Sequence, residues 1–429
     1  MKNIKNMFKH ATVKNSAWII GERVIQMIIS FIITMISARY LGPSNYGVLS
    51  YGASFVTFFT AIVKLGLDGI IVKELIDNPD KEGKLLGTSL FFRIISSFIS
   101  ILLILLCVYI LKPNNKLIIV TSFLQSIALV FQALSFLDYW YQSKLKSKYV
   151  SIAKSLSYIM VSAYKFFLLF SKADIKWFAL SNAFDYFLIC ILLFIFYKFN
   201  KGPKLQIDYK LGINLLKKSY HFIISGIMVV IYTQIDKIMI GSILDETSVG
   251  IYAAALSLHT AYSFLPDAII TSARPTVFNA LKQDRSLYKK RLMQTFCLVF
   301  WLCFICSLGI TIFSKLIIDV VYGEKYLNAM GSLLILAWAV PFSNIGNVRG
   351  IWIVGEEKQK YAKKYLILST ILNIILNAIL ISKIGIAGAA VATLITEIFQ
   401  AFIAPLFYKD TIEVTKIALN GIFFKFNMK

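Results

Sequence analysis

The sequence has little of the chemistry that metalloproteins and most enzymes use. Its 429 residues contain 3 histidines and 5 cysteines. The histidines have no metal-ligand spacing with cysteines or carboxylates, and the cysteines all lie in apolar runs, where they are typical of small buried hydrophobic residues. The sequence contains no Walker loop, which argues against ATP hydrolysis by this chain. We therefore expect no metal, no cofactor and no catalytic residues.

Acidic residues are also scarce, with 22 Asp and Glu against 45 Lys and Arg, a net charge of +23. In a soluble protein this excess would suggest nucleic acid as a partner. Here the basic residues fall between apolar runs, where they set membrane topology and contact anionic lipid headgroups. The sequence therefore predicts anionic lipids as partners and no nucleic acid.

Long apolar runs are abundant. The chain is 58% hydrophobic and its mean hydropathy is +0.72, and a run of about 20 apolar residues is long enough to cross a bilayer as a helix. We predict an all-α polytopic membrane protein with twelve transmembrane helices. The predicted spans are 16–38, 44–66, 86–111, 116–137, 150–170, 177–197, 219–243, 248–272, 292–314, 329–354, 362–382 and 386–407.

Lys and Arg are concentrated in every second connection, beginning with the N-terminal segment. The positive-inside rule then places both termini in the cytoplasm, and an even number of spans agrees with this. We expect a multi-pass membrane protein with both termini on the cytoplasmic side.

Three short matches, each about 200 positions apart, indicate that the chain is an internal duplication. Ser44–Val48 matches Thr247–Ile251, Leu67–Ile71 matches Pro266–Ile270, and Trp140, Lys148 and Tyr149 recur as Trp352, Lys360 and Tyr361. Two halves with an even number of spans share one orientation, so their pseudo-two-fold axis runs along the membrane normal. The predicted organisation is a six-helix bundle (1–197), a basic cytoplasmic linker (198–218), a second bundle (219–407) and a cytoplasmic tail (408–429).

The linker and the tail have more polar patterns than the spans. The linker is predicted to form in part an amphipathic helix on the inner membrane surface, and the tail is expected to lie on the membrane as well. Between the first two spans, Gly42 and Pro43 predict a very short reversal and a hinge, because proline lacks the amide proton and clashes with the preceding turn.

Charges inside the spans are costly in lipid, so we treat them as candidate functional residues. The cations are Arg23, Lys165, Lys237 and Arg349, with Arg39 at the outer mouth, and the carboxylates are Glu22, Asp236 and Glu397. For each a structural alternative stays open: snorkelling for Glu22 and Arg23, an internal ion pair for Asp236 and Lys237, and a protonated structural carboxyl for Glu397. Arg93 is expected to snorkel to the inner edge.

The deep cations outnumber the deep carboxylates, and a cationic, water-filled cavity suits an anionic cargo because Arg and Lys match phosphate groups. The hypothesis is that Arg23, Arg39, Lys165, Lys237 and Arg349 contact such a cargo. Glu22, Asp236 and Glu397 are candidates for coupling to a Na+ or H+ gradient, with the membrane potential as an alternative.

The stretch SARYLGPSNYGVLSY (Ser37–Tyr51), together with QIDKIMIGSILDETSVGIYAAA (Gln234–Ala255), resembles the polysaccharide flippase family. These are the Wzx-type O-antigen and capsule-repeat transporters of the multidrug/oligosaccharidyl-lipid/polysaccharide superfamily. The resemblance implies two six-helix bundles that open alternately to each side. It also implies an undecaprenyl-diphosphate-linked oligosaccharide as cargo, moved from the cytoplasmic to the periplasmic leaflet of the bacterial inner (cytoplasmic) membrane, and cavity arginines that map onto Arg23 and Arg39. Other polysaccharide assembly proteins are further partners that the resemblance implies.

Three rival functions are weaker. A drug exporter of the same superfamily would favour a cavity dominated by carboxylates. A lipid II flippase commonly has two further C-terminal spans, whereas Tyr408–Lys429 is too polar and too short for them. An O-antigen polymerase or ligase would need a large periplasmic loop, and the outer loop from Ser314 to Asn328 is short.

Overall fold

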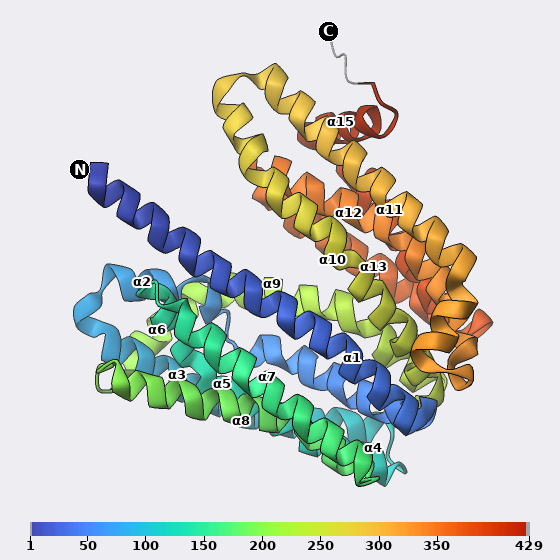
Figure 1. The fold of residues 1–429 in the computed structure, drawn as a ribbon, viewed down its shortest axis with the longest axis horizontal. Helices are drawn as coiled ribbons and strands as arrows, with labels where there is room; N and C mark the ends of the chain where they lie inside the picture. The colour runs from blue at the N-terminus through green and yellow to red at the C-terminus, as the bar shows by residue number, and fades with distance from the viewer. Residues whose placement is uncertain (1, 426–429) are drawn as a thin grey trace. The chain divides into compact units, whose positions relative to one another are not determined.

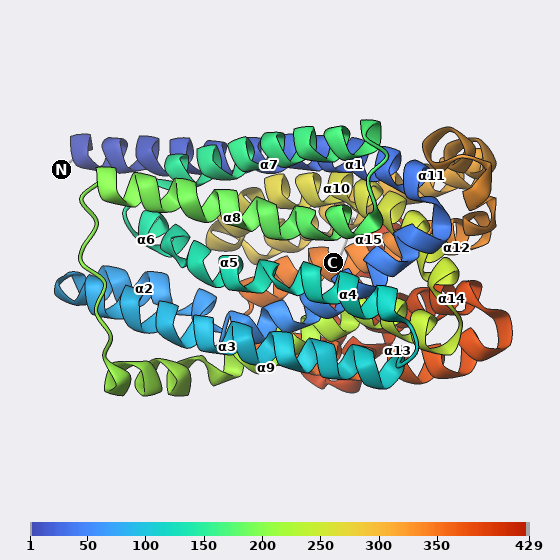
Figure 2. The same ribbon diagram turned by 90° about the horizontal axis from the view of Figure 1, so that it is seen from below.

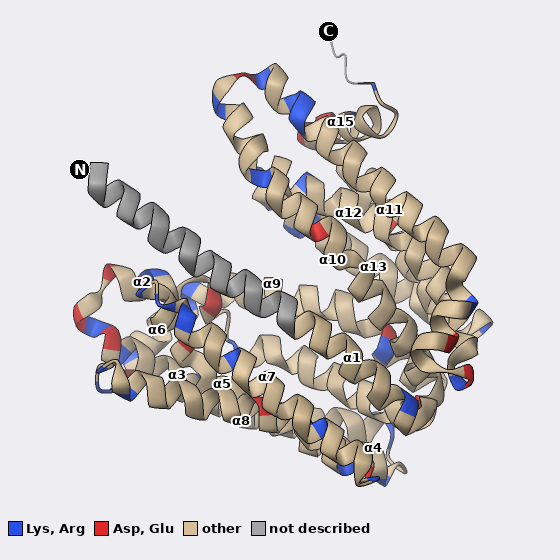
Figure 3. Ribbon diagram, viewed as in Figure 1, with Lys and Arg blue, Asp and Glu red and all other residues tan. Residues whose placement is uncertain are grey.

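The computed structural model describes residues 2–425, with side chains from residue 26 onward. All the regular secondary structure of these residues is helical, as predicted. Figure 3 shows charged residues at helix ends and in connections, with long uncharged stretches between them. Uncharged helical stretches are suited to lipid, because a helix satisfies every backbone N–H and C=O group within its own segment.

The chain folds into two compact units. Unit 1 comprises residues 1–41 and 48–230, and unit 2 comprises residues 42–47 and 231–429. The division falls within one helix, α9, later in the chain than the predicted linker. The cause is local, since the first turns of α9 pack on unit 1: Lys218 Nζ lies 2.6 Å from Glu74 Oε1, and Gly66 and Gly69 closely approach Ser219 and Phe222.

The helices of unit 1 carry the first six predicted spans (Figures 1 and 2). In chain order they are α1 (Lys2–Val63), α2 (Ile71–Asp77), α3 (Glu82–Leu111), α4 (Lys116–Ser126), α5 (Ala128–Leu134), α6 (Asp138–Ser143), α7 (Ser147–Phe170) and α8 (Ile175–Phe199), followed by the start of α9 (Tyr209–Ile243).

Unit 2 carries the last six spans. Beyond α9 its helices are α10 (Glu246–Gln283), α11 (Arg285–Tyr322), α12 (Met330–Gly355), α13 (Gln359–Ile384), α14 (Ile386–Ile398) and α15 (Ile412–Ile422). A π-helical turn over Phe399–Ile403 and a 3₁₀ turn over Ala404–Phe407 follow α14.

Ten segments among the described residues are long and apolar enough to cross a membrane. One of them, Gln26–Val63, covers most of the first two predicted spans on either side of a kink, and α10, which is less apolar, contains the eighth. The twelve predicted spans therefore all have a helix or a leg of a helix, and the predicted fold class is confirmed.

The kink in α1 lies at Gly42, which adopts φ 70° and ψ 170°. Glycine populates positive φ at no steric cost, and the next residue, Pro43, has no amide proton for the helix to use. The two legs of α1 run in opposite senses on either side of this point (Figures 1 and 2). The predicted reversal at Gly42–Pro43 is confirmed, and its role as a hinge stays a prediction.

Unit 1 has a polar cluster at the edge of its hydrophobic core. Arg93 is 2% exposed, and its guanidinium lies 3.8 Å from Asp68 and above the rings of Phe136 and Tyr139. Tyr139 also hydrogen-bonds to Asp68. The expectation that Arg93 snorkels to the membrane surface is therefore wrong, because aromatic faces and a carboxylate compensate its burial.

The second half of the linker is helical, in agreement with the prediction that the linker forms a helix in part, and its place on the membrane surface stays a prediction. Residues 202–208 have no regular secondary structure, and α9 begins at Tyr209. The segment before α9 pairs with α3, where Gln206 N donates to Gly83 O at 3.0 Å and the Thr88 hydroxyl accepts from Asp208 N at 2.8 Å. Gly83 and Gly87 allow this close approach, because a Cβ atom at either position would overlap the linker backbone.

The tail forms a helix, α15, that packs against protein, and its place on the membrane stays a prediction. Val414, Ile417, Ala418 and Ile422 are buried in the core of unit 2. Lys289 Nζ of α11 lies 2.7 Å from Glu413 Oε1, and this contact holds the pKa of Glu413 below its usual range. The amphipathic pattern of the tail indicated a buried face, and α11 supplies the surface that covers it.

Two glycines at matching positions of the duplicated sequence pack closely within unit 2. A Cβ atom at Gly47 would overlap the carbonyl oxygen of Glu246, and one at Gly250 would overlap that of Pro43. Neither neighbour is the end of a flexible side chain, so an added methyl group must move the backbone. The repeated glycine therefore marks a close helix–helix approach, of the kind that small residues permit in membranes.

We expect Gly250→Ala to lower the thermal midpoint of the purified protein, since overpacking costs about 1–3 kcal/mol. Gly350→Ala in α12 is the matched control, because nothing lies within 4 Å of its added methyl group. The measurement is thermal unfolding in detergent, followed by cysteine labelling or size-exclusion chromatography. Equal midpoints for the two variants would contradict the close approach.

Candidate functional site

A buried carboxylate joins four helices of unit 2. Asp236 on α9 is 9% exposed. It accepts hydrogen bonds from Tyr252 Oη at 2.7 Å, Asn377 Nδ2 at 2.7 Å and Thr393 Oγ1 at 2.9 Å. These donors come from α10, α13 and α14. No salt bridge to the adjacent Lys237 exists among the described residues, so neutral donors satisfy Asp236, and the structural alternative of an internal ion pair with Lys237 is not observed.

The helices present these groups because the polar residues recur four positions apart, which places them on one helix face. The pairs are Tyr232 and Asp236 on α9, Asn373 and Asn377 on α13, and Thr393 and Glu397 on α14. We call these six residues, with Tyr252, the Asp236 cluster.

The three pairs of the Asp236 cluster interlock. Tyr232 Oη donates to Glu397 Oε1 at 2.7 Å, while Thr393, one turn before Glu397, donates to Asp236. Asn377 also donates to Asn373 Oδ1 at 3.0 Å. Two of the three carboxylates that the sequence selected for coupling, Asp236 and Glu397, thus lie on the same pair of helices, α9 and α14. A change of charge at Asp236 alters hydrogen bonds to α10, α13 and α14.

The cluster is suited to exchanging one positive charge. A carboxylate away from bulk water is costly unless its hydrogen bonds are satisfied, and a proton or a cation relieves that cost. Its neighbours supply oxygen atoms, and the Oδ1 atom of Asn377 is buried without a hydrogen-bond partner. Oxygen ligands of this kind bind hard cations. Protonation or cation binding would change the hydrogen bonds that connect the helices.

Arg349 on α12 lies beside the cluster, but it bonds to backbone carbonyls rather than to the cluster. It is 3% exposed, and its Nη1 atom donates to Gln400 O at 2.6 Å and Ala401 O at 3.1 Å. Its guanidinium also lies 4.8 Å from the centre of the Tyr365 ring. The expected exposure of Arg349 to a water-filled cavity is not observed.

Pro405 explains why these two carbonyls need a donor. In an α-helix the amide of residue 405 would bond to Ala401 O, and in a π-helix it would bond to Gln400 O, but proline has no amide proton. The Ala404 amide already bonds to Phe399 O. Arg349 therefore satisfies two backbone acceptors that would otherwise be orphaned in the membrane.

The remaining candidates lie apart from this cluster. In unit 1, Lys165 on α7 is partly exposed and interacts electrostatically with Asp185 on α8, whose Oδ1 atom accepts from the Ser157 hydroxyl at 2.6 Å. Arg39 is exposed on α1, just before the kink. Lys237 is partly exposed. Glu22 and Arg23 have side chains outside the described residues.

The sequence matches the model of a family described as "Polysaccharide biosynthesis protein" over residues 12–281. The chain belongs to that family. A second model, MatE, matches residues 222–379 of this polysaccharide biosynthesis protein. The resemblance stated from the two motifs is confirmed.

Several named proteins are similar to it. A "Putative O-antigen transporter" of Escherichia coli (strain K12) is 25% identical over 87% of the chain and 90% of that protein. A protein of the same name from Shigella flexneri is 23% identical over 92% and 97%. The "Probable low-salt glycan biosynthesis flippase Agl15" of Haloferax volcanii is 28% identical, but the match covers 43% of the chain and 40% of that protein.

Solved structures share the fold. The inward closed conformation of the lipid II flippase MurJ superposes with a TM-score of 0.74 at 18% identity, covering 96% of this chain and 91% of that one. An inward-facing MATE family transporter superposes with a TM-score of 0.67 at 12% identity, over 91% and 95%. At these identities the likeness shows the fold alone.

Sequence reasoning selected Asp236, Glu397 and Arg349, and it missed the neutral members of the Asp236 cluster. These are Tyr232, Tyr252, Asn373, Asn377 and Thr393. A usable signal was present for most of them: polar residues four positions apart within otherwise apolar runs (Tyr232 with Asp236, Asn373 with Asn377, Thr393 with Glu397). The choice of charge as the only criterion overlooked it.

We expect Thr393→Val to lower the thermal midpoint, because it removes a donor to the buried Asp236 at a cost of about 1–3 kcal/mol. Thr396→Val is the control in the same helix, since the Thr396 hydroxyl bonds only to Ala392 O of its own helix. Thermal unfolding of both variants is the measurement. A midpoint for Thr396→Val as low as that for Thr393→Val would show that the contact to Asp236 contributes nothing specific.

Arg349→Gln is expected to destabilise the protein, because the backbone carbonyls of Gln400 and Ala401 lose their donor. If this is the cause, Pro405→Ala, which restores the missing amide, will recover part of the lost stability in the Arg349→Gln background. The two single variants and the double variant form a thermodynamic cycle measured by thermal unfolding. If the stability changes of the two single variants simply add in the double variant, Arg349 does not compensate for the missing amide of Pro405.

Proposed function

We propose that this protein is a flippase that carries a lipid-linked oligosaccharide across the membrane, and that it is a transporter rather than an enzyme. The proposed cargo is an undecaprenyl-diphosphate-linked O-antigen or capsule repeat unit, moved from the cytoplasmic to the periplasmic leaflet of the bacterial inner membrane. Family membership and the full-length similarity to proteins named as O-antigen transporters support this proposal.

The observation that carries the mechanism is the Asp236 cluster. Binding of H+ or Na+ at Asp236 would weaken its bonds to Tyr252, Asn377 and Thr393, and would thereby change how α10, α13 and α14 are held against α9. Since Tyr232 connects Glu397 to the same helix, the change reaches both carboxylates. We propose this as the coupling step of alternating access.

The anionic end of the cargo requires cationic side chains. We propose Arg23, Arg39, Lys165 and Lys237 for this role. A diphosphate favours Arg and Lys donors because their charge-assisted hydrogen bonds are stronger than neutral ones. Arg349 is a weaker candidate, because its guanidinium is already bonded to Gln400 and Ala401.

Deletion of the gene in its own host tests the function. We expect surface polysaccharide to be lost and the lipid-linked oligosaccharide to accumulate, with both phenotypes reversed by the wild-type gene. Asp236→Asn should fail to reverse them at normal protein level. Asp319→Asn, which changes an exposed carboxylate of α11 outside the cluster, should succeed.

Membrane vesicles that contain labelled lipid-linked oligosaccharide separate the coupling ions. An imposed pH gradient or an imposed Na+ gradient should accelerate translocation by the wild type, and Asp236→Asn should abolish the acceleration. Acceleration that persists in Asp236→Asn would exclude Asp236 as the coupling residue. In the deletion experiment, normal surface polysaccharide in the absence of the gene would contradict the proposed cargo.

A further inference from the structure

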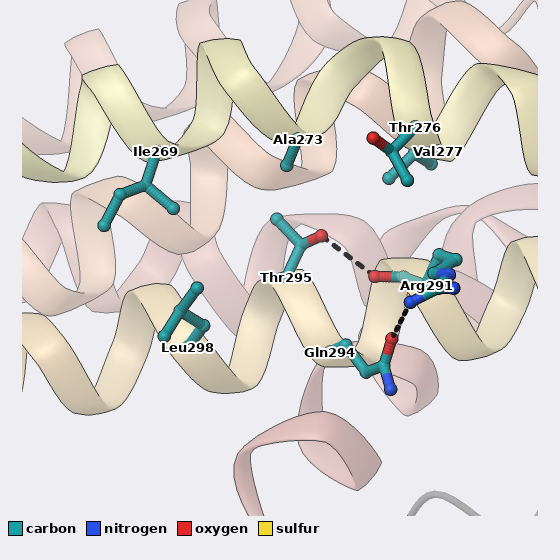
Figure 4. Close-up of a pocket in the computed structure, with 8 residues that line it drawn as sticks. All are labelled: Ile269, Ala273, Thr276, Val277, Arg291, Gln294, Thr295 and Leu298. Atoms are coloured by element: carbon teal, nitrogen blue, oxygen red, sulfur yellow. Dashed lines mark hydrogen bonds between the residues drawn. The ribbon is translucent and has the colours of Figure 1, made fainter.

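A pocket of about 200 Å³ lies between α10 and α11. Figure 4 shows how its walls differ from end to end. Leu298 and Ile269 line one end, and Ala273 lies midway. Arg291 and Thr276 face each other from the two helices at the other end. The pocket is therefore amphipathic along its length, with a cation at one end and aliphatic side chains at the other.

The cation is available for a ligand. Among the described side chains, Arg291 has no carboxylate partner, and its Nη1 atom donates a hydrogen bond to Gln294 Oε1 at 3.2 Å. A guanidinium has five N–H donors, so most of them remain for an incoming oxyanion. The Thr276 hydroxyl across the pocket is a further donor.

The pocket opens on the lipid-facing side of α11. Arg291, Leu298, Ile305 and Ile312 are spaced by seven residues, or about two helical turns, and so share one face. The last three are exposed by 57%, 64% and 67%. Large aliphatic side chains this exposed in a membrane-spanning helix contact acyl chains. Along this face of α11, the side chains therefore change from aliphatic ones that contact acyl chains to the cation of Arg291.

The depth of this change fits a phospholipid. At ~1.5 Å per residue, Leu298 lies about 10 Å from Arg291 along the helix. The apolar span begins next to Arg291, and the α10–α11 connection beyond it is basic, as expected for a headgroup region. A phosphate at Arg291 would place the start of the acyl chains beside Leu298 and Ile269.

The gap between the helices follows from the sequence of α10. Pro275 lies inside this helix. It lacks an amide proton, and its ring prevents the regular bond to the carbonyl of Thr271, which bends a helix locally. Ala273 presents only a methyl group toward α11. The proline and the small side chain of Ala273 together leave a gap between α10 and α11, which regular helices with larger side chains would fill.

We propose that this pocket binds an anionic glycerophospholipid, with the phosphate at Arg291 and Thr276 and the acyl chains along Leu298 and Ile269. Arginine recognises a phosphate by paired hydrogen bonds, and basic pockets between transmembrane helices bind anionic headgroups. The site is distinct from the Asp236 cluster, and the proposal does not depend on the proposed cargo.

Native mass spectrometry of the purified full-length protein with phosphatidylglycerol or phosphatidylcholine tests the proposal. We expect wild type to retain phosphatidylglycerol preferentially, and Arg291→Gln to bind it about tenfold more weakly, as expected for a lost charged hydrogen bond. Lys290→Gln is the matched control. It removes the same charge one position away, from an exposed residue that does not line the pocket.

A second variant, Ala273→Leu, keeps the charge and fills the middle of the pocket. It should also weaken phosphatidylglycerol binding, while its thermal unfolding and elution volume confirm that it is folded. Equal losses in Lys290→Gln and Arg291→Gln would overturn the site in favour of a diffuse charge effect. Equal retention of phosphatidylcholine, or displacement of the lipid by inorganic phosphate alone, would overturn the anionic lipid as the occupant.

Discussion

Lipid offers no hydrogen bonds, and this constraint governs both units. The backbone satisfies its own N–H and C=O groups by forming helices, and the apolar runs of the sequence make these helices long enough to span a bilayer. Buried charged side chains are compensated by groups on neighbouring helices. Asp236 does so with three neutral donors, and Arg93 with a carboxylate and two aromatic rings. The contacts of Asp236 and Arg93 therefore also report which helices are neighbours.

The same constraint gives two kinds of buried charge in unit 2. Arg349 compensates a fixed defect, because Pro405 removes an amide permanently and the carbonyls of Gln400 and Ala401 always need a donor. Asp236 is different, since a proton or a cation can replace the hydrogen bonds that stabilise its charge. The first arrangement is suited to holding one structure, and the second is suited to changing between two.

The fold was largely predictable because span length, charge asymmetry and the Gly42–Pro43 break are properties of the chain in order. The fates of individual charges were less predictable. Sequence shows that Arg93 and Arg349 lie in apolar surroundings, but it does not show that Asp68 or the Gln400 carbonyl comes within reach. Thr393 and Asn377 were missed for the same reason, because their importance comes from Asp236 on another helix. The packing of α15 likewise depended on α11, more than 90 residues earlier in the chain.

The π-helical turn at Phe399–Ile403 has a consequence for the C-terminal end of unit 2. A π turn contains one more residue than the corresponding α turn. If this turn became α-helical, everything after Ile403 would rotate about the helix axis by ~100°. The Ala404 amide would then bond to Gln400 O, Arg349 would keep only Ala401 O of its two acceptors, and the segment that leads to α15 would leave α14 in a different direction. The guanidinium of Arg349 thus fixes the angular register with which the chain leaves its last membrane span.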